Sequence, residues 1–290
     1  MANEVTSSAV SALYANVVAE ATFLAQERSI MRPLVRVQDI AGVAGKTVQF
    51  PIYPTVAAAD LTEGQEIGNT LVTPDAVEIA VAEIGVGTLV TDLARNSATG
   101  DLVGALGRLF GEGIAKKMDQ KVIAEFANFT NSLGAAGSDL TAELIFKAVA
   151  TLRAQSVYSP MYGVFHPSQT FALKRALANA GSANVPALSD AGNTALAEGF
   201  IGTIAGVQLF ESAAIAVDGN GDAVGGIFTR DALGVAMKRD LTIEAQRNAK
   251  ARGDDLVAHM VMGAGALVPA YGVKIIANAT LQLKQESLKK

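Results

Sequence analysis

The chain has 290 residues, enough for two sub-domains or one elongated domain, and its 50% apolar and 18% charged composition suggests that surface is also buried between subunits. A net charge of −5 excludes the basic footprint of tight nucleic-acid binding, and the absence of cysteine excludes disulfides, thiol nucleophiles and thiolate metal sites. No apolar run is long enough to cross a bilayer and no basic residue precedes Arg28, so neither a membrane span nor a signal peptide is expected.

The first predicted element is an amphipathic helix over residues 6–28. Thr6, Ser7 and Ser8 are candidate caps, and apolar residues follow at steps of three and four. Pro33 then blocks a helix and favours an extended conformation for the residue before it. Residues 29–45 should therefore form an extended arm.

A long hairpin is predicted next. Apolar and polar residues alternate over 47–52 and again over 77–81, which is the period of two strands. The connection 57–74 is too long for a tight turn, and it carries three acids, Asp60, Glu63 and Glu66. Because a two-stranded hairpin alone is marginal in water, it should lie on its own domain or on a neighbouring subunit.

The stretch 101–129 is predicted to form one long helix, roughly 43 Å in length at about 1.5 Å per residue. Its polar positions should face water, and they are Arg108, Glu112, Lys116, Asp119 and Gln120. Its apolar positions recur at steps of three and four along one side, and they are Leu102, Leu106, Leu109, Phe110, Ile114, Met118, Val122, Phe126 and Phe129.

Four glycines lie in the first half of this helix, where each costs about 0.8 to 1 kcal/mol relative to alanine. Gly104, Gly107 and Gly111 are spaced to leave a groove along which another backbone lies close, while Gly113 stands apart from them. The alternative is a locally weak or kinked helix. The sequence leaves both interpretations open.

The rest of the chain is predicted to alternate helices and strands. Helices are expected over 140–154 and 168–179, with a short strand at 163–166 between them and a surface loop at 181–199. Six further segments look like strands: 207–211, 225–229, 233–238, 241–246, 256–262 and 273–277. Helices in the middle and strands late in the chain indicate an α+β fold.

Sequence motifs for catalysis and metal binding are weak. His166 and His259 are the only imidazoles, and neither lies in a nucleophile-elbow or metalloprotease pattern, so each is expected to occupy a strand or its end. Asp218, Asn220 and Asp222 resemble the start of a calcium loop, but the required later glycine and glutamate are absent, and a polar hairpin turn is favoured. No catalytic, cofactor or metal site is expected.

Two glycine-rich fragments match part of a dinucleotide-binding fingerprint. GVGTLV, starting at Gly85, and GAGALV, starting at Gly263, have the first two glycines of a dinucleotide fingerprint and lack the third. Both are interpreted as strand ends.

The order of elements resembles the major capsid protein of tailed bacteriophages over essentially the whole chain. Four stretches carry the likeness: LVTDLARNS before the long helix, GVFHPSQTFALKRAL, GTIAGVQLFES, and the closing run from GIFTRDALGVAMKRD to GVKIIA. The resemblance implies four parts: an N-terminal arm at 1–45, an extended loop at 46–94, a peripheral domain with a spine helix at 95–139 and 226–290, and an axial domain at 140–225.

The resemblance also implies the function. We expect a non-enzymatic shell subunit without cofactors that assembles through pentamers and hexamers into an icosahedral virion head around double-stranded DNA. Its main partner would be itself, with separate scaffolding, portal and decoration proteins, weak contact with DNA, no membrane, and assembly in the host cytoplasm. Because no lysine lies between Lys46 and Lys116, the lysine-to-asparagine cross-links of some relatives are not expected from the hairpin.

Charge suggests where subunits meet. The acids at the hairpin tip are expected to contact basic residues of a neighbour, and the candidate contacts are Asp60, Glu63, Glu66, Arg247, Lys250 and Arg252. Two alternatives remain open. One is an encapsulin-like compartment that encloses a cargo protein, and the other is a soluble α+β enzyme that uses His166 or His259.

Overall fold

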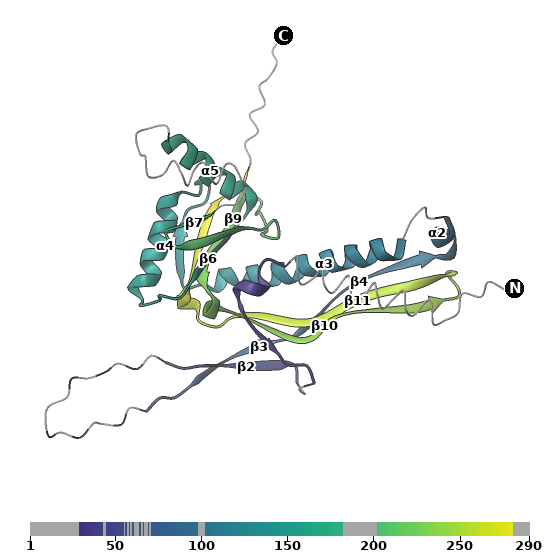
Figure 1. Cartoon of the computed structure of the whole chain (residues 1–290), viewed down its shortest axis with the longest axis horizontal. Coiled ribbons are helices and arrows are strands. Elements are labelled where there is room, and N and C mark those ends of the chain that lie inside the picture. Colours follow the sequence, from purple (N-terminus) through teal and green to yellow (C-terminus); the bar gives the residue numbers. More distant parts are fainter. Residues whose placement is uncertain are drawn as a thin grey trace, which may run out of the picture.

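Two sheets joined by a long helix make up most of the molecule, and a two-stranded hairpin projects away from both (Figure 1). The computed structural model describes residues 29–42, 45–54, 71–97, 102–181 and 202–280, together with residues 56, 58, 60, 64, 66 and 69. The predicted helix at 6–28 and nearly all of the predicted loop at 181–199 lie outside the described residues.

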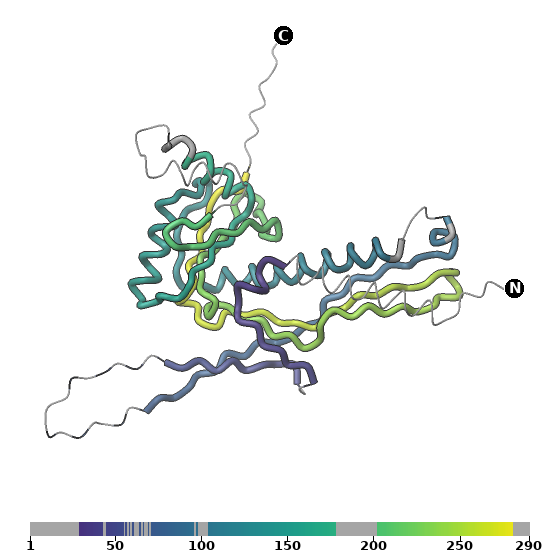
Figure 2. Tube along the Cα trace, in the orientation of Figure 1, coloured from purple at the N-terminus to yellow at the C-terminus, as the bar shows by residue number. Residues whose placement is uncertain are grey.

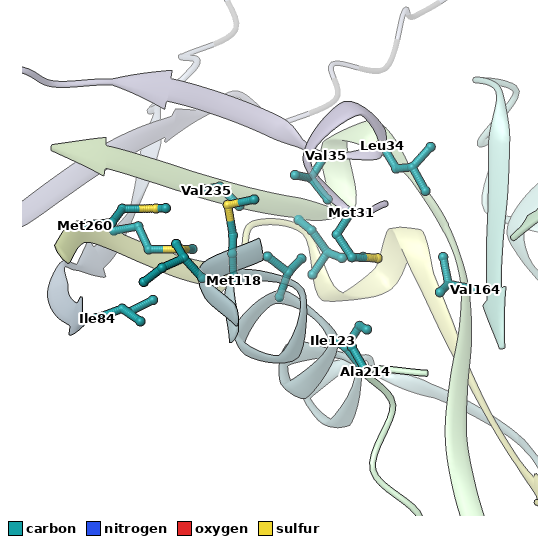
Figure 3. Close-up of a cluster of buried hydrophobic side chains, with 14 of the residues drawn as sticks. Met31, Leu34, Val35, Ile84, Met118, Ile123, Val164, Ala214, Val235 and Met260 are labelled. Atoms are coloured by element: carbon teal, nitrogen blue, oxygen red, sulfur yellow. The ribbon is translucent and has the colours of Figure 1, made fainter. Parts of the chain in front are cut away.

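The long predicted helix is confirmed as α3 (Leu102–Ala124), and its last turn is a 3-10 helix, η2 (Glu125–Asn128). Its apolar stripe packs on the four-stranded sheet and buries side chains of that sheet in one main core. Figure 3 shows Met118 of the helix near Val235 and Met260 of the sheet, and Ile123 of the helix near Ala214. The buried members of the stripe are Phe110, Ile114, Met118, Val122, Phe126 and Phe129.

Two residues of this helix were assigned to the wrong side. Leu109 is 61% exposed, because it precedes Phe110 and is rotated about 100° from it, away from the core. Asp119 is only 4% exposed, because the segment from Ser29 to Met31 covers it and donates hydrogen bonds to its carboxylate.

The four-stranded sheet has the order β1-β10-β11-β4. The strand β1 pairs in parallel with β10, and the other two pairings are antiparallel. One short helix, α2 (Asp92–Ser97), follows β4 directly. The strands are β1 (Arg36–Asp39), β4 (Ala82–Thr91), β10 (Leu233–Asn248) and β11 (Gly253–Ala266).

Two details of this sheet differ from the prediction. The expected strands 233–238 and 241–246 form a single strand, β10, whose pairing with β11 is irregular between Met237 and Thr242. Gly85 was expected at a strand end, but it lies inside β4, opposite His259 of β11. Gly263 does lie near the end of β11, as expected.

The six-stranded sheet has the order β5-β12-β9-β6-β8-β7, with helices α4 (Ala142–Ala154) and α5 (Pro167–Gly181) packed on it. Thr141 caps α4, because its side chain accepts a hydrogen bond from the backbone N–H of Leu144. Both predicted helices and the predicted strands at 163–166, 207–211, 225–229 and 273–277 are confirmed, whereas β5 and β7 were not predicted. The strands are β5 (Asn131–Gly134), β6 (Met161–Phe165), β7 (Thr203–Ile204), β8 (Val207–Glu211), β9 (Asp222–Thr229) and β12 (Gly272–Asn278).

Aromatic rings at the end of the long helix join the two sheets. Phe126 and Phe129 stack with ring centroids 5.5 Å apart, and Phe228 of β9 lies 5.3 Å from Phe126. A Cβ built on Gly272 would lie 2.4 Å from the Phe129 ring, so glycine is needed for this close packing. Short 3-10 helices mark the crossings between the sheets, η3 (Arg230–Ala232) and η4 (Pro269–Tyr271).

The predicted hairpin is confirmed as β2 (Thr47–Ile52) paired antiparallel with β3 (Asp75–Ala80). The segment before it is extended only in part, because η1 (Arg32–Leu34) precedes β1. In the tube view this early part of the chain lies against α3 and β10 (Figure 2). Met31, Leu34 and Val35 are buried in the main core there (Figure 3).

Candidate assembly site

The base of the hairpin is fixed to its own chain. Val48, Phe50 and Ile79 are buried in a small core with Ala236 and Leu267 of the neighbouring sheet region. Glycine makes this close contact possible, since a Cβ built on Gly263 would lie 2.3 Å from the carbonyl oxygen of Ala80. The hairpin therefore leaves the subunit in a defined direction.

The outer part of the hairpin carries apolar side chains that stay exposed in the part of the chain that the structure describes. Tyr53 is 69% exposed and Leu71 is 89% exposed, and Val56 and Val72 are exposed as well. A cluster of large exposed apolar residues on one projecting element is typical of an interaction site. These exposed side chains indicate an interaction surface.

A second open surface is the face of the four-stranded sheet that points away from α3. Alternate residues of β11, such as Leu256, Ala258 and Met260, are buried against the main core, so Val257 and His259 point to the opposite face. Val257 is 44% exposed there and pairs with Gly87 of β4, whereas His259 is buried. We call the residues Gly85, Gly87, Leu89, Glu244, Val257 and His259 the outer sheet face.

Ion pairs hold the far end of this sheet together. The Nη1 and Nη2 atoms of Arg247 donate hydrogen bonds to the Asp92 carboxylate, at 2.7 and 2.6 Å, and Nη1 also lies 3.3 Å from Asp254. Arg95 binds the other oxygen of Asp254 at 2.5 Å. The hydrogen bond from Arg247 lowers the pKa of Asp92 below its usual value. These contacts tie α2 to the ends of β10 and β11 that flank the turn between them.

The six predicted contact residues fall into separate places. Arg247 pairs within its own chain, whereas Lys250 and Arg252 are exposed in the β10–β11 turn, where Arg252 has a positive φ of 50°. Asp60 and Glu66 are exposed, and Glu63 lies outside the described residues. In one chain β2 and β3 run away from the end of the sheet that holds the β10–β11 turn (Figure 1). Among the described residues, the structure does not bring Asp60 and Glu66 together with the three bases within a subunit.

The two histidines also lie apart: His166 directly follows β6 of the six-stranded sheet, and His259 lies in β11 of the four-stranded sheet. The Nδ1 atom of His166 accepts a hydrogen bond from the backbone N–H of Ser168 at the start of α5, and burial lowers the pKa of this imidazole. His259 lies on the outer sheet face, with its Nε2 atom 3.2 Å from Arg239 and 3.9 Å from Glu244. A hollow of about 520 Å³ beside α5, lined by Ser138, Phe171 and Arg175 among others, is bordered by neither histidine.

The predicted turn at Asp218 is confirmed. Its carboxylate accepts hydrogen bonds from the backbone of Asn220 and Asp222, and the Asp222 carboxylate accepts one from Gly137. Across the part of the chain that the structure describes, no group of three histidine, aspartate or glutamate residues could hold a metal ion. Nor is any helix of that part long and apolar enough to span a membrane.

Sequence reasoning missed the anchor of the early segment at Asp119. Its Oδ1 atom accepts hydrogen bonds from Ser29 Oγ at 2.6 Å and from the Met31 N–H at 3.2 Å, and Oδ2 accepts one from the Ile30 N–H at 3.0 Å. Burial raises the pKa of this carboxyl, and the three hydrogen bonds oppose that shift. The sequence offered one indication that Asp119 is buried: it lies four and eight residues after Ala115 and Gly111, on the same side of the helix, where small residues indicate close packing.

A family model described as phage capsid protein matches residues 74–275, from the end of the hairpin connection to β12. No curated protein sequence matches the chain. The solved capsid structure of the cyanophage P-SCSP1u is similar, with 18% sequence identity over 87% of this chain and 89% of that chain and a TM-score of 0.69.

Two further solved structures resemble the chain. The head of Helicobacter pylori bacteriophage KHP40 shares 10% identity over 87% of this chain and 92% of that chain, with a TM-score of 0.68. A virus-like particle from Pyrococcus furiosus shares 13% identity over 90% and 97%, with a TM-score of 0.60. These likenesses confirm the predicted α+β fold of tailed-phage capsids.

Proposed function

The chain belongs to the phage capsid protein family and is a shell subunit, and we propose that it assembles through pentamers and hexamers into an icosahedral head that encloses double-stranded DNA. The observation that carries this proposal is the hairpin, which has a base buried in its own subunit and an outer part with uncovered apolar side chains. Repeated head-to-tail contacts close into rings, and rings that share edges form a shell.

The hairpin is the proposed strap between subunits. Laid over a neighbour, Tyr53, Leu71 and Val72 would bury apolar surface that is exposed in the single chain. The outer sheet face is the best candidate to receive them, because Leu89 and Val257 are exposed there beside two glycines that leave the sheet surface low. The buried base of the hairpin fixes its direction in the free subunit, and its exposed outer part is left available to bind a neighbouring subunit.

Removal of residues 57–71 tests the strap. The base at Phe50 and Ile79 is left intact by this deletion, so the subunit should still fold, with an unfolding midpoint close to that of the full chain. Assembly should be lost. Normal shells from the deletion variant would refute the strap.

Charge is proposed to set the fit of neighbouring subunits. The acids of the hairpin tip would meet Lys250 and Arg252, and the Arg247 contact is weaker because that side chain already binds Asp92. Changing all three acids to lysine should abolish assembly, and reversing the basic residues in the same protein should partly restore it. No loss of assembly in the first variant would end the charge proposal. The acids are Asp60, Glu63 and Glu66.

The shell itself is tested by light scattering and negative-stain micrographs of the purified full chain. Hollow particles, or rings of five and six, would support the proposal, and their content would separate a DNA-filled head from a compartment that holds a cargo protein. That compartment stays a second candidate because the virus-like particle from Pyrococcus furiosus shares the fold. A small oligomer with activity that depends on His166 or His259 would instead favour the enzyme alternative.

The remaining parts of the proposal follow from the family. The family match supports a structural role in a virion capsid. Assembly in the host cytoplasm, separate scaffolding, portal and decoration proteins, and weak contact with DNA are proposed with it. So is the division into a peripheral part around α3 and an axial part around α4 and α5. The strands β5 and β12 fall within the ranges 95–139 and 226–290, which the resemblance assigned to the peripheral domain. Because both strands pair within the six-stranded sheet, we assign them to the axial part in this proposal.

A further inference from the structure

One face of α3 is buried although it is turned away from the stripe that packs on the sheet. Gly107, Gly111, Ala115 and Asp119 each directly follow a residue of that stripe, so they are rotated about 100° around the helix. All four are buried, and so is Gly104 three residues earlier. We call these five residues the small-residue face of α3.

The chain itself begins to cover this face at Asp119. Ser29, Ile30 and Met31 all donate hydrogen bonds to the Asp119 carboxylate. Ile30 also lines a small hollow with Ala115, which lies one turn closer to the start of α3. The 28 residues that precede Ser29 therefore begin beside Asp119 and Ala115, at one end of the small-residue face, in a hollow that Ser212, Ala213 and Ala214 also line.

Those residues match the face in length and in spacing. Residues 6–28 contain neither glycine nor proline and are predicted to form an amphipathic helix. Ser29 and Asp119 are 90 positions apart, and two parallel helices with the same rise keep that offset. The offset sets Tyr14, Val17, Ala21 and Ala25 opposite Gly104, Gly107, Gly111 and Ala115.

The glycines supply the reason for such a partner. Three glycines inside a helix cost about 1 kcal/mol each relative to alanine, and here they lie together on one face. Because glycine has no side chain, a second helix can approach these positions closely. The side chains of Tyr14 and Val17 would then occupy the space above the glycines. By contrast Gly113 is exposed, and a Cβ built on it would meet nothing within 4 Å.

We propose that residues 6–28 form a helix that packs parallel to α3 of the same chain, seated on the small-residue face, with Asp119 as the positioning residue that sets the register. The docked helix thickens α3 into a two-helix beam along the sheet. This inference concerns contacts within one subunit and does not depend on shell assembly.

Engineered cysteines test the register, since the natural chain has none to interfere. The full chain with V17C and G107C, or with A21C and G111C, should form a disulfide within one chain under mild oxidation, because Cα atoms about 4.4 to 6.8 Å apart can be bridged. A faster band on a non-reducing gel and the linked peptides in mass spectrometry report it. The matched control, V17C with G113C, should stay reduced.

The other outcomes overturn the proposal. Equal oxidation of the control means that the segment has no fixed position. A disulfide between chains in both test pairs assigns the face to a neighbour's segment. No disulfide in either test pair means that residues 6–28 lie elsewhere.

Alanine substitutions give a second measurement that does not depend on cysteine chemistry. Helix propensity alone predicts that G107A, G111A and G113A each raise the unfolding temperature, by about 2 °C in a chain of this size. The proposal expects that rise only for G113A, and a fall for G107A and G111A because an added methyl would push the docked helix away. A rise in all three variants would contradict it.

Discussion

Replacing Asp119 tests how the early segment is held on α3. The change Asp119→Ala leaves the Ser29 hydroxyl and the N–H groups of Ile30 and Met31 without their acceptor in a site that is only 4% exposed at Asp119. Each unsatisfied buried donor costs about 1–3 kcal/mol, while removal of a buried carboxylate returns part of that cost. We expect a net loss of about 2–4 kcal/mol in the free energy of unfolding.

The conservative change Asp119→Asn should cost less, about 1–2 kcal/mol, because one amide oxygen can still accept two of the three hydrogen bonds. Urea unfolding of the unassembled subunit measures both values. Amide hydrogen exchange gives the local readout, since Ile30 and Met31 should exchange faster in Asp119→Ala. Unchanged exchange at both amides, or an alanine variant as stable as the natural chain, would refute the anchor.

The same residue gives a pH dependence of known sign. Burial raises the Asp119 pKa above its ordinary value of 3.8, so the folded chain holds this proton to a higher pH than the unfolded chain does. Proton binding to Asp119 therefore stabilises the folded chain fully at pH values below its ordinary pKa, and this stabilisation is lost as the pH rises through the raised pKa of the folded chain. The stability of the natural chain minus that of Asp119→Asn should therefore fall as pH rises across this window. A difference that rises with pH would contradict the assignment.

Two further sites offer matched pairs of substitutions. Gly134→Ala should lower the free energy of unfolding in urea by about 2–4 kcal/mol, because φ is +82° and the new methyl would lie 2.2 Å from the carbonyl oxygen of Ile276. Gly137→Ala should lower it by only about 1–2 kcal/mol, because φ is also positive there but the new methyl would meet no atom within 4 Å. Phe50→Ala should cost about 3–5 kcal/mol and loosen the hairpin base, while Tyr53→Ala should change the stability by less than about 0.5 kcal/mol yet impair assembly seen in micrographs. Equal costs in the glycine pair, or normal shells from Tyr53→Ala, would count against these readings.

Regular patterns allowed much of the fold to be predicted. The alternation around Phe50 and Ile79 is strong enough to place both strands of the hairpin, and the stripe from Phe110 to Phe129 places α3. Asp119 could not be placed in the same way, because its burial depends on a segment ninety residues away in the chain. A charged residue on a helix is expected in water unless such a partner is known.

The candidate assembly site was predicted only in outline. The exposed acids of the hairpin were identified from sequence, but the pairing of Arg247 with Asp92 depends on α2, a helix that the sequence did not indicate. The apolar outer part of the hairpin was also missed, since Tyr53 and Leu71 flank proline-containing stretches without a regular period. Contacts between subunits depend on the shapes of two surfaces, and one chain's pattern does not encode that fit.

A cryo-electron microscopy reconstruction of particles formed by the full chain tests the central claim most directly. The account predicts a closed shell of five- and six-membered rings in which the hairpin of each subunit lies on the outer sheet face of its neighbour, with Tyr53 and Leu71 buried there. Particles whose hairpins contact only their own subunit, or a chain that forms no shell with any partner, would contradict it.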